Sequence, residues 1–336
     1  MKYFHISENA IKLVVMKAGF IVYILIFFNF NYFPLRLEGQ GKIEVMVVPP
    51  DPALNWKNPT ILTLGYLRSY AQKTFAKKLS GRERSAMGHG IVRVKCSTEA
   101  EEVDFWSGFS GNENYRGLYL LLGGAGLSIM TYNYLDGHIQ STEFVQKYLD
   151  DIIQQPKIQA GFIRMNISQE QCEIIRNHYE GFRQNGTENL IYGFFTDPLS
   201  LEGAGCTSYA TSFAQKSGVF SPFLQEKWTR TIEISAKNLG PTNQASSIEG
   251  YQLKPVSFIR FINFLRPLRW KKENDKLIRF SFIDPQYMAD FFRQSIECLE
   301  HPENCKNKPE LLNWLKENEA ELCSNEYLRG IEIRLK

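Results

Sequence analysis

The chain has 336 residues, of which 43% are apolar and 13% aromatic. This composition excludes a chain that is disordered throughout, and it suffices for one large core or two modest ones. The net charge of +3, from 39 basic and 36 acidic residues, is too small to indicate nucleic acid as the main partner.

Residues 1–40 predict an export signal or a membrane anchor. Lys12 and Lys17 precede the apolar run AGFIVYILIFFNFNYFPL, which the polar stretch RLEGQGK follows. No small-x-small cleavage motif stands out before Gly39, and the uninterrupted apolar part is short for a membrane span. A buried helix is the third alternative. We therefore expect an exported protein of the periplasm or cell envelope that contacts a membrane only if this segment stays uncleaved.

Strands and helices alternate through the middle of the chain. Apolar residues at helical spacing predict helices, and apolar–polar alternation predicts strands of an antiparallel sheet. The stretch 116–135 is interpreted as a strand interrupted by glycines. The expected strands are 43–48, 88–96, 101–111, 116–135 and 159–167, and the expected helices are 60–81, 141–155 and 168–186.

The helix over 168–186 has the clearest end signals. Ser168 and Gln171 fit a capping box. Cys172 shares a face with three apolar residues and is predicted to lie in the core, whereas His178 is predicted to be solvated.

The fold class predicted from this order is α+β, with an antiparallel sheet packed against helices. We expect a domain over residues 41–282 and a helical extension over 283–336. The extension has helices beginning near Asp284 and Pro309 and a final strand in YLRGIEIRLK.

The six cysteines are compatible with an oxidising compartment. Cys298 and Cys305 bracket a short loop between two predicted helices and Cys323 follows the second helix, so one disulfide among these three is expected. The spacing of cysteines, histidines and carboxylates matches no zinc or calcium motif. We expect neither a metal nor a cofactor.

Cys206 is the strongest candidate for chemistry. The loop of small residues LEGAG delivers it to the beginning of an amphipathic helix. A helix amino terminus favours a thiolate, and the amides around Gly205 and Cys206 are candidates for an oxyanion hole. The competing interpretations are a cysteine packed in a tight turn, or one in a disulfide with Cys96 or Cys172.

A thiol nucleophile needs a base, and an imidazole suits this role near neutral pH. His89 begins a predicted strand between two glycines and is favoured over His138, which follows a turn signal. Glu102 and Asp104, near the start of the next strand, are candidates for orienting the imidazole; the alternative is a solvated acidic turn.

This order of parts resembles the circularly permuted papain-like hydrolases, which include relatives of NlpC-type cell-wall peptidases and of lecithin retinol acyltransferase. The resemblance covers about residues 85–217 and rests on the GH-led strand and on a cysteine that opens a helix. It implies a permuted papain-like core with extra carboxyl-terminal helices, Cys206 as nucleophile and His89 as base.

The resemblance also implies an amidase, peptidase or acyltransferase, with cell-wall peptide or an acyl group as substrate. A non-enzymatic envelope protein that binds a partner or a glycan is the alternative. The segment FINFLRPLRWKK interleaves aromatic and basic residues. It fits an exposed basic face better than a nucleic-acid or anionic-surface patch.

Overall fold

The structure is a computed structural model. Residues 40–336 cluster as one compact unit. The predicted export segment, residues 1–40, and the predicted final strand, residues 327–336, lie outside the described residues. The structure describes residues 41–80, 87–111, 116–153, 160–185, 190–318 and 321–323.

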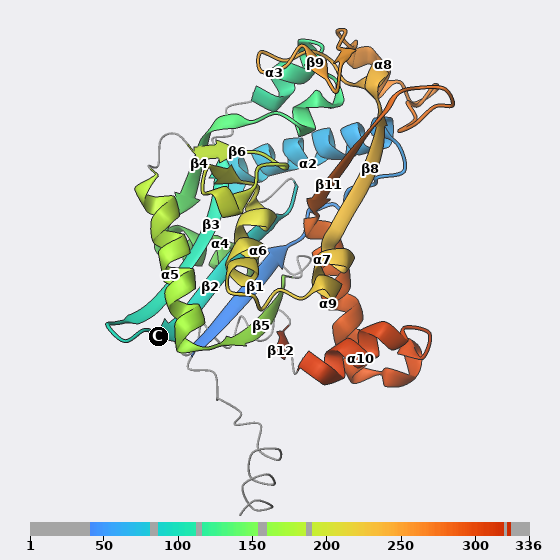
Figure 1. Ribbon diagram of the computed structural model, residues 1–336. Helices are drawn as coiled ribbons and strands as arrows, with labels where there is room; N and C mark the ends of the chain where they lie inside the picture. Colours follow the sequence, from blue (N-terminus) through green and yellow to red (C-terminus); the bar gives the residue numbers. More distant parts are fainter. Residues whose placement is uncertain are drawn as a thin grey trace, which may run out of the picture. The chain divides into compact units, whose positions relative to one another are not determined.

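An eight-stranded, mostly antiparallel sheet organises the described part of the chain (Figure 1). The strand order is β12-β5-β1-β2-β3-β4-β6-β7, and β6 and β7 form the parallel pair. This sheet, packed against helices, confirms the predicted α+β class. The strands are β1 Gly41–Val48, β2 His89–Ser97, β3 Glu102–Gly111, β4 Tyr134–Gln140, β5 Gly161–Ile167, β6 Leu190–Tyr192, β7 Gly203–Ala204 and β12 Glu321–Cys323.

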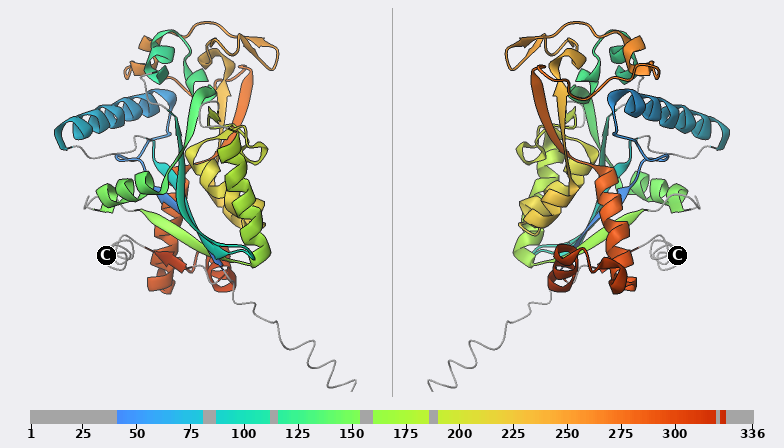
Figure 2. Two further views of the ribbon diagram at one scale, coloured as in Figure 1. Left: turned by 90° about the vertical axis from the view of Figure 1, so that its left-hand side faces the viewer. Right: turned by 90° about the vertical axis from the view of Figure 1, so that its right-hand side faces the viewer.

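Helices cover both faces of the sheet (Figure 2). Val92 and Val94 belong to the core beneath α5 (Gln169–Gln184) and α6 (Cys206–Lys216). Ile91 belongs to a separate cluster with Tyr148 and Leu149 of α4 (Thr142–Ile153). Successive residues of β2 therefore face different helices, as strand geometry requires.

The expected strands at 43–48, 88–96, 101–111 and 159–167 are confirmed, and so are the three helices. The first of these helices in the chain, α2, spans Pro59–Ser80. Ser168 and Gln171 form the predicted capping box of α5, with both reciprocal hydrogen bonds present. Phe144, which the helical spacing of the apolar residues predicts on the buried side of α4, is 45% exposed, whereas its neighbour Val145 is fully buried.

The interpretation of residues 116–135 as an interrupted strand was wrong. The segment forms helix α3 (Arg116–Leu122), a 3₁₀ turn (Leu127–Met130) and only then β4. Leu121 is buried while Leu122 is exposed, which is the pattern of an amphipathic helix with one covered side. Gly124 follows with a φ of +94°, a conformation that ends the helix without the steric penalty of a side chain.

A third cluster of buried apolar residues lies beside the sheet and contains Leu121, Phe261 and Phe282. It joins α3 to an antiparallel pair of strands and to the short helix α8, which Figure 1 shows near α3. The elements of this region are β8 Thr229–Ser235, β9 Ser247–Ile248, β10 Tyr251–Gln252, α8 Phe258–Ile262 and β11 Leu277–Ile283.

The carboxyl-terminal helices pack into the main core. The two helices expected near Asp284 and Pro309 are present as α9 (Pro285–Glu300) and α10 (Pro309–Asn318), with α7 (Pro222–Trp228) beside α9. A disulfide joins Cys298 to Cys305, as expected for one pair among the three cysteines of this region. The side chain of Cys323 is outside what the structure describes.

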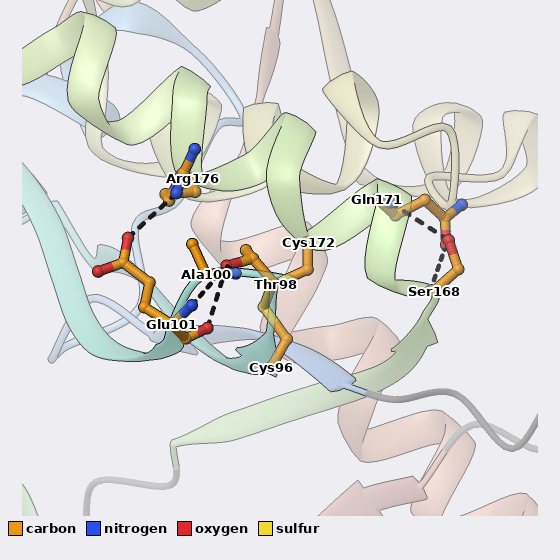
Figure 3. The surroundings of a disulfide bond; sticks show 8 residues. All are labelled: Cys96, Thr98, Ala100, Glu101, Ser168, Gln171, Cys172 and Arg176. Carbon is orange, nitrogen blue, oxygen red and sulfur yellow. Dashed lines mark hydrogen bonds and ion pairs between the residues drawn. A yellow bond between two sulfur atoms is a disulfide. The ribbon is translucent and has the colours of Figure 1, made fainter.

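A second disulfide, between Cys96 of β2 and Cys172 of α5, fastens the helix to the sheet (Figure 3). Near this disulfide, Arg176 of α5 forms an ion pair of 3.1 Å with Glu101, which lies between β2 and β3. Because Cys96 and Cys172 bond to each other and Cys206 is a free thiol, the alternative of a disulfide at Cys206 was wrong.

His178 is also placed differently from the prediction, which had it solvated. Its side chain is 3% exposed, and Nε2 lies 2.9 Å from Ser212 Oγ of α6. Ser212 donates its own proton to the Tyr209 carbonyl at 2.7 Å, so His178 Nε2 donates to Ser212. Burial, aided by the charge of Lys216, lowers the pKa of His178 to about 4.

This shift predicts a loss of stability in acid. Between about pH 6.5 and pH 4 the unfolded chain binds a proton that native His178 does not, so the free energy of unfolding falls by roughly 3 kcal/mol across this window. Denaturant titrations at pH 7 and pH 4.5 measure the effect. In His178→Gln, whose amide can still donate to Ser212, the difference between the two pH values is expected to shrink; an unchanged difference would contradict the assignment.

The two disulfides predict unequal losses of stability. Cys96 and Cys172 are 76 residues apart, whereas Cys298 and Cys305 are 7 apart. Replacing the first pair by alanine should lower the free energy of unfolding by about 4 kcal/mol, and replacing the second pair by about 2 kcal/mol, since a longer closed loop restricts the unfolded chain more. Denaturation without reductant tests this order, and a larger loss from the second pair would refute it.

Candidate active site

Helix α6 begins at Cys206 because its first turn is closed locally. Ser208 Oγ accepts a hydrogen bond from the Gly205 amide at 2.9 Å and donates to the Gly205 carbonyl at 3.1 Å. Thr207 Oγ1 donates to the Ile283 carbonyl of β11 at 2.6 Å. Tyr209, Ala210 and Phe213, which share the apolar side of the predicted amphipathic helix, are fully buried. These contacts fix the position of the helix terminus.

Gly90 lets the amino terminus of α6 lie directly on β2. A Cβ atom at this position would lie 2.7 Å from the Thr207 Cα and 2.8 Å from the Cys206 carbonyl oxygen. Both are backbone atoms, so a side chain would displace the helix itself. The structure thus brings Cys206 to the residue that follows His89.

The Cys206 thiol lies among hydrogen-bond donors and is 7% exposed. It accepts hydrogen bonds from the backbone amides of Gly90 and Thr207 and from the Tyr192 hydroxyl, all of which favour the thiolate. Burial outweighs them and raises the pKa of the Cys206 thiol. The expectation of a thiolate favoured by the helix terminus is therefore not met, because desolvation opposes the same charge.

The imidazole of His89 is held by Gln140 of β4. His89 Nε2 lies 2.7 Å from Gln140 Oε1, and both side chains are buried. An amide oxygen can only accept, so Nε2 carries the proton and Nδ1 is the basic nitrogen. The ring also meets Tyr148 of α4 edge-on, with 5.4 Å between ring centroids. These contacts fix the tautomer and the orientation of the ring.

Glu102 and Asp104, the residues predicted to orient His89, lie at the other end of the sheet. Glu102 is opposite Ser97, eight residues along β2 from His89, or roughly 25 Å. Asp104 forms ion pairs with Arg93 at 3.7 Å and Lys95 at 3.9 Å. The structure assigns the orienting contact to Gln140 instead.

The other predicted site residues are placed as follows. The Gly205 amide, a candidate oxyanion donor, is bonded to Ser208. His138 is half-buried on β4, with Nδ1 3.5 Å from the Asp136 carbonyl. Sequence reasoning missed Gln140 and Tyr192, both of which come to the site through strand pairing. In the described part of the chain, no cluster of three or more histidine, cysteine or acidic residues could hold a metal ion.

A cavity of about 220 Å³ lies beside these residues, and His89 and Tyr192 form part of its wall. Most of its lining is aromatic or aliphatic. Because Tyr192 also donates to the Cys206 thiol, one residue connects the cavity to the sulfur. Its apolar lining includes Trp56, Leu67, Leu118, Leu121, Met130 and Phe194.

The raised pKa predicts a slow native thiol. At neutral pH, iodoacetamide should label Cys206 in the folded protein about tenfold or more slowly than in urea, with a rate that climbs as the pH rises. Tyr192→Phe removes a donor to the sulfur and should slow native labelling further. Tyr132→Phe, which alters a hydroxyl bonded to Asn243, is the matched control. Equal rates in folded and unfolded protein would contradict the assignment.

No protein-family model matches the chain, and no curated protein matches it significantly. Among solved structures, the type VI secretion system effector TseH is similar to it at 12% sequence identity and a TM-score of 0.25. The match covers 55% of this chain and 82% of that one. A likeness at this level supports no statement about activity, and the papain-like resemblance of the His89 and Cys206 segments stays a prediction.

Proposed function

We propose that this protein is an exported cysteine hydrolase or acyltransferase of the permuted papain-like kind, acting on an amide or ester. The observation that carries the proposal is that the Cys206 thiol, at the start of α6, meets the backbone of β2 one residue after His89, and that Gln140 of β4, as a positioning residue, holds the His89 imidazole. The thiol accepts a hydrogen bond from the amide next to His89, and the imidazole has a fixed tautomer.

The neutral thiol determines the proposed order of proton transfer. As sulfur forms a bond to the carbonyl carbon, the thiol proton passes to His89 Nδ1, which makes the histidine a general base. The imidazolium then returns the proton to the departing amine or alkoxide as the carbon–leaving-group bond breaks. Water, or an acceptor hydroxyl or amine, releases the acyl group from sulfur in the second half.

Charge on the carbonyl oxygen needs donors near the sulfur. The Tyr192 hydroxyl and the backbone amide of Cys206 both donate hydrogen bonds to the Cys206 sulfur. We assign these two donors to the oxyanion that forms on the substrate carbonyl. The Gly205 amide, bonded to Ser208, is less suited to this role. Gln140 keeps Nδ1 basic by holding the proton on Nε2, as the third member of a catalytic triad does.

The cavity favours a substrate with an apolar group near the scissile carbonyl. Its wall is mostly aromatic and aliphatic, so an acyl chain or an apolar peptide side chain gains by entering it. Cell-wall peptides and acyl esters both remain within the proposed substrate class.

Export is part of the same proposal. Disulfides at Cys96–Cys172 and Cys298–Cys305 are stable in an oxidising compartment, which supports the periplasm or cell envelope. Among the described helices, none is long and apolar enough to cross a membrane.

Variants of the three residues test the mechanism. Release of product from p-nitrophenyl esters of increasing chain length and from muropeptides is expected to vanish in Cys206→Ala and to fall about 10²- to 10⁴-fold in His89→Asn. Gln140→Ala should lower kcat about tenfold or more and displace the acid limb of the pH–rate profile. His138→Asn, a histidine on the same sheet, is the matched control.

The outcomes separate this function from its rival. A folded Cys206→Ala variant with full activity would eliminate the thiol mechanism. The burial of Cys206 and its raised pKa favour one other candidate, a non-enzymatic envelope protein in which this cysteine is packing. Wild-type protein without activity on either substrate class, together with a Cys206 thiol inert to acyl-directed electrophiles, would favour that candidate.

A further inference from the structure

Residues 254–272, here named the basic apolar segment, leave large apolar side chains in solvent. Ile259 of α8 is 68% exposed, Phe264 74% and Leu265 80%. Asn263 Oδ1 accepts hydrogen bonds from the amides of Leu265 and Arg266, both at 3.1 Å. This turn holds the tip of the loop in place while its side chains project outward.

The same segment carries one sign of charge. It contains six basic residues and no acidic one, and Arg260, Arg266 and Arg269 are exposed. Among the described residues, the structure gives these three arginines no carboxylate partner. Lys271 is paired with Glu233, at 3.4 Å. The exposed apolar side chains therefore lie close in the chain to arginines that have no carboxylate partner among the described residues.

The segment is firmly attached to the fold. Phe261 is fully buried, and the Leu268 amide donates to Thr60 Oγ1 at 2.9 Å. Trp270 Nε1 donates to the Trp56 carbonyl at 2.8 Å, and the two indole rings stack with centroids 6.0 Å apart. The exposed side chains are thus presented by an ordered loop. Trp56 also lines the cavity described above.

We propose that the basic apolar segment docks the protein on an anionic lipid surface. Ile259, Phe264 and Leu265 would enter the boundary between headgroups and acyl chains, and the arginines would pair with lipid phosphates. Ile259 and Leu265 are aliphatic and cannot stack on bases, which argues against nucleic acid as the partner. They project singly and gain by transfer into hydrocarbon, whereas a protein partner would need a matching apolar pocket for each.

Helix α3, next to the basic apolar segment, also exposes apolar side chains. The Val256 amide donates to the Gly124 carbonyl at 2.8 Å, which places the end of α3 beside the segment. Tyr119 and Leu122 of α3 are 68% and 55% exposed. Figures 1 and 2 show α3 and α8 near one another, at the end of the sheet away from α10.

Vesicle sedimentation of the full chain tests the docking. Vesicles of phosphatidylcholine alone are compared with vesicles that also contain phosphatidylglycerol. Wild-type protein is expected to partition onto the anionic vesicles and to leave them as salt is added. The double variant Phe264→Ser, Leu265→Ser should lose about a hundredfold in partition. Arg266→Glu with Arg269→Glu should lose about tenfold or more.

Matched controls remove an exposed leucine and reverse an exposed positive charge elsewhere on the protein. Leu299→Ser removes a leucine that is 53% exposed on α9, and Lys306→Glu reverses an exposed charge near α10. Both should partition as wild type does. The amino-terminal segment is identical in all variants, so it contributes equally to each measurement.

A label at the loop tip gives a local readout that the amino-terminal segment does not affect. Leu265→Cys, coupled to an environment-sensitive fluorophore, should shift its emission to the blue with anionic vesicles. Unchanged emission would overturn the proposal. So would a shift on raising the protein concentration without lipid, which indicates a second copy, or a shift only with single-stranded oligonucleotides. Circular dichroism confirms that each variant is folded.

Discussion

The close contact between the amino terminus of α6 and β2 is the constraint on which the candidate site depends. A single hydrogen atom in place of a side chain at Gly90 allows the backbone of Cys206 and Thr207 to lie on the strand. Gly108 does the same on the other face, where a Cβ would lie 2.3 Å from Gln140 Oε1 and 3.1 Å from His89 Nε2. Two glycines on neighbouring strands thereby make room for a helix terminus and for an imidazole–amide pair.

The chemistry of the thiol follows from a competition that this packing creates. The contact with β2 supplies an amide donor to the sulfur, and the helix terminus supplies another. The same contact removes water, and the loss of hydration outweighs the donors. A cysteine held in this way is suited to a mechanism in which proton removal and bond formation occur together, because the isolated thiolate is disfavoured.

Local signals in the sequence predicted most of the elements and about half of the candidate site. The capping box at Ser168 and the apolar periods of α4 and α5 depend on neighbours within one turn, so they are visible in the chain. Gln140 is 51 residues from His89 and meets it only through the pairing of three strands. Glu102 was wrongly predicted to orient His89, because in antiparallel strands the start of one strand lies opposite the end of the preceding strand. His178 was misjudged because its polar partner, Ser212, lies on another helix.

The ends of the large sheet have a consequence for behaviour at high concentration. As described, the sheet ends in β12, of three residues, and in β7, of two. An edge strand exposes unpaired amides and carbonyls that can recruit a strand of another molecule, and short edges offer few of them. The long, strongly apolar strands β1 and β2 lie in the interior of the sheet. The order of strands thus protects the most aggregation-prone segments of the chain once it has folded.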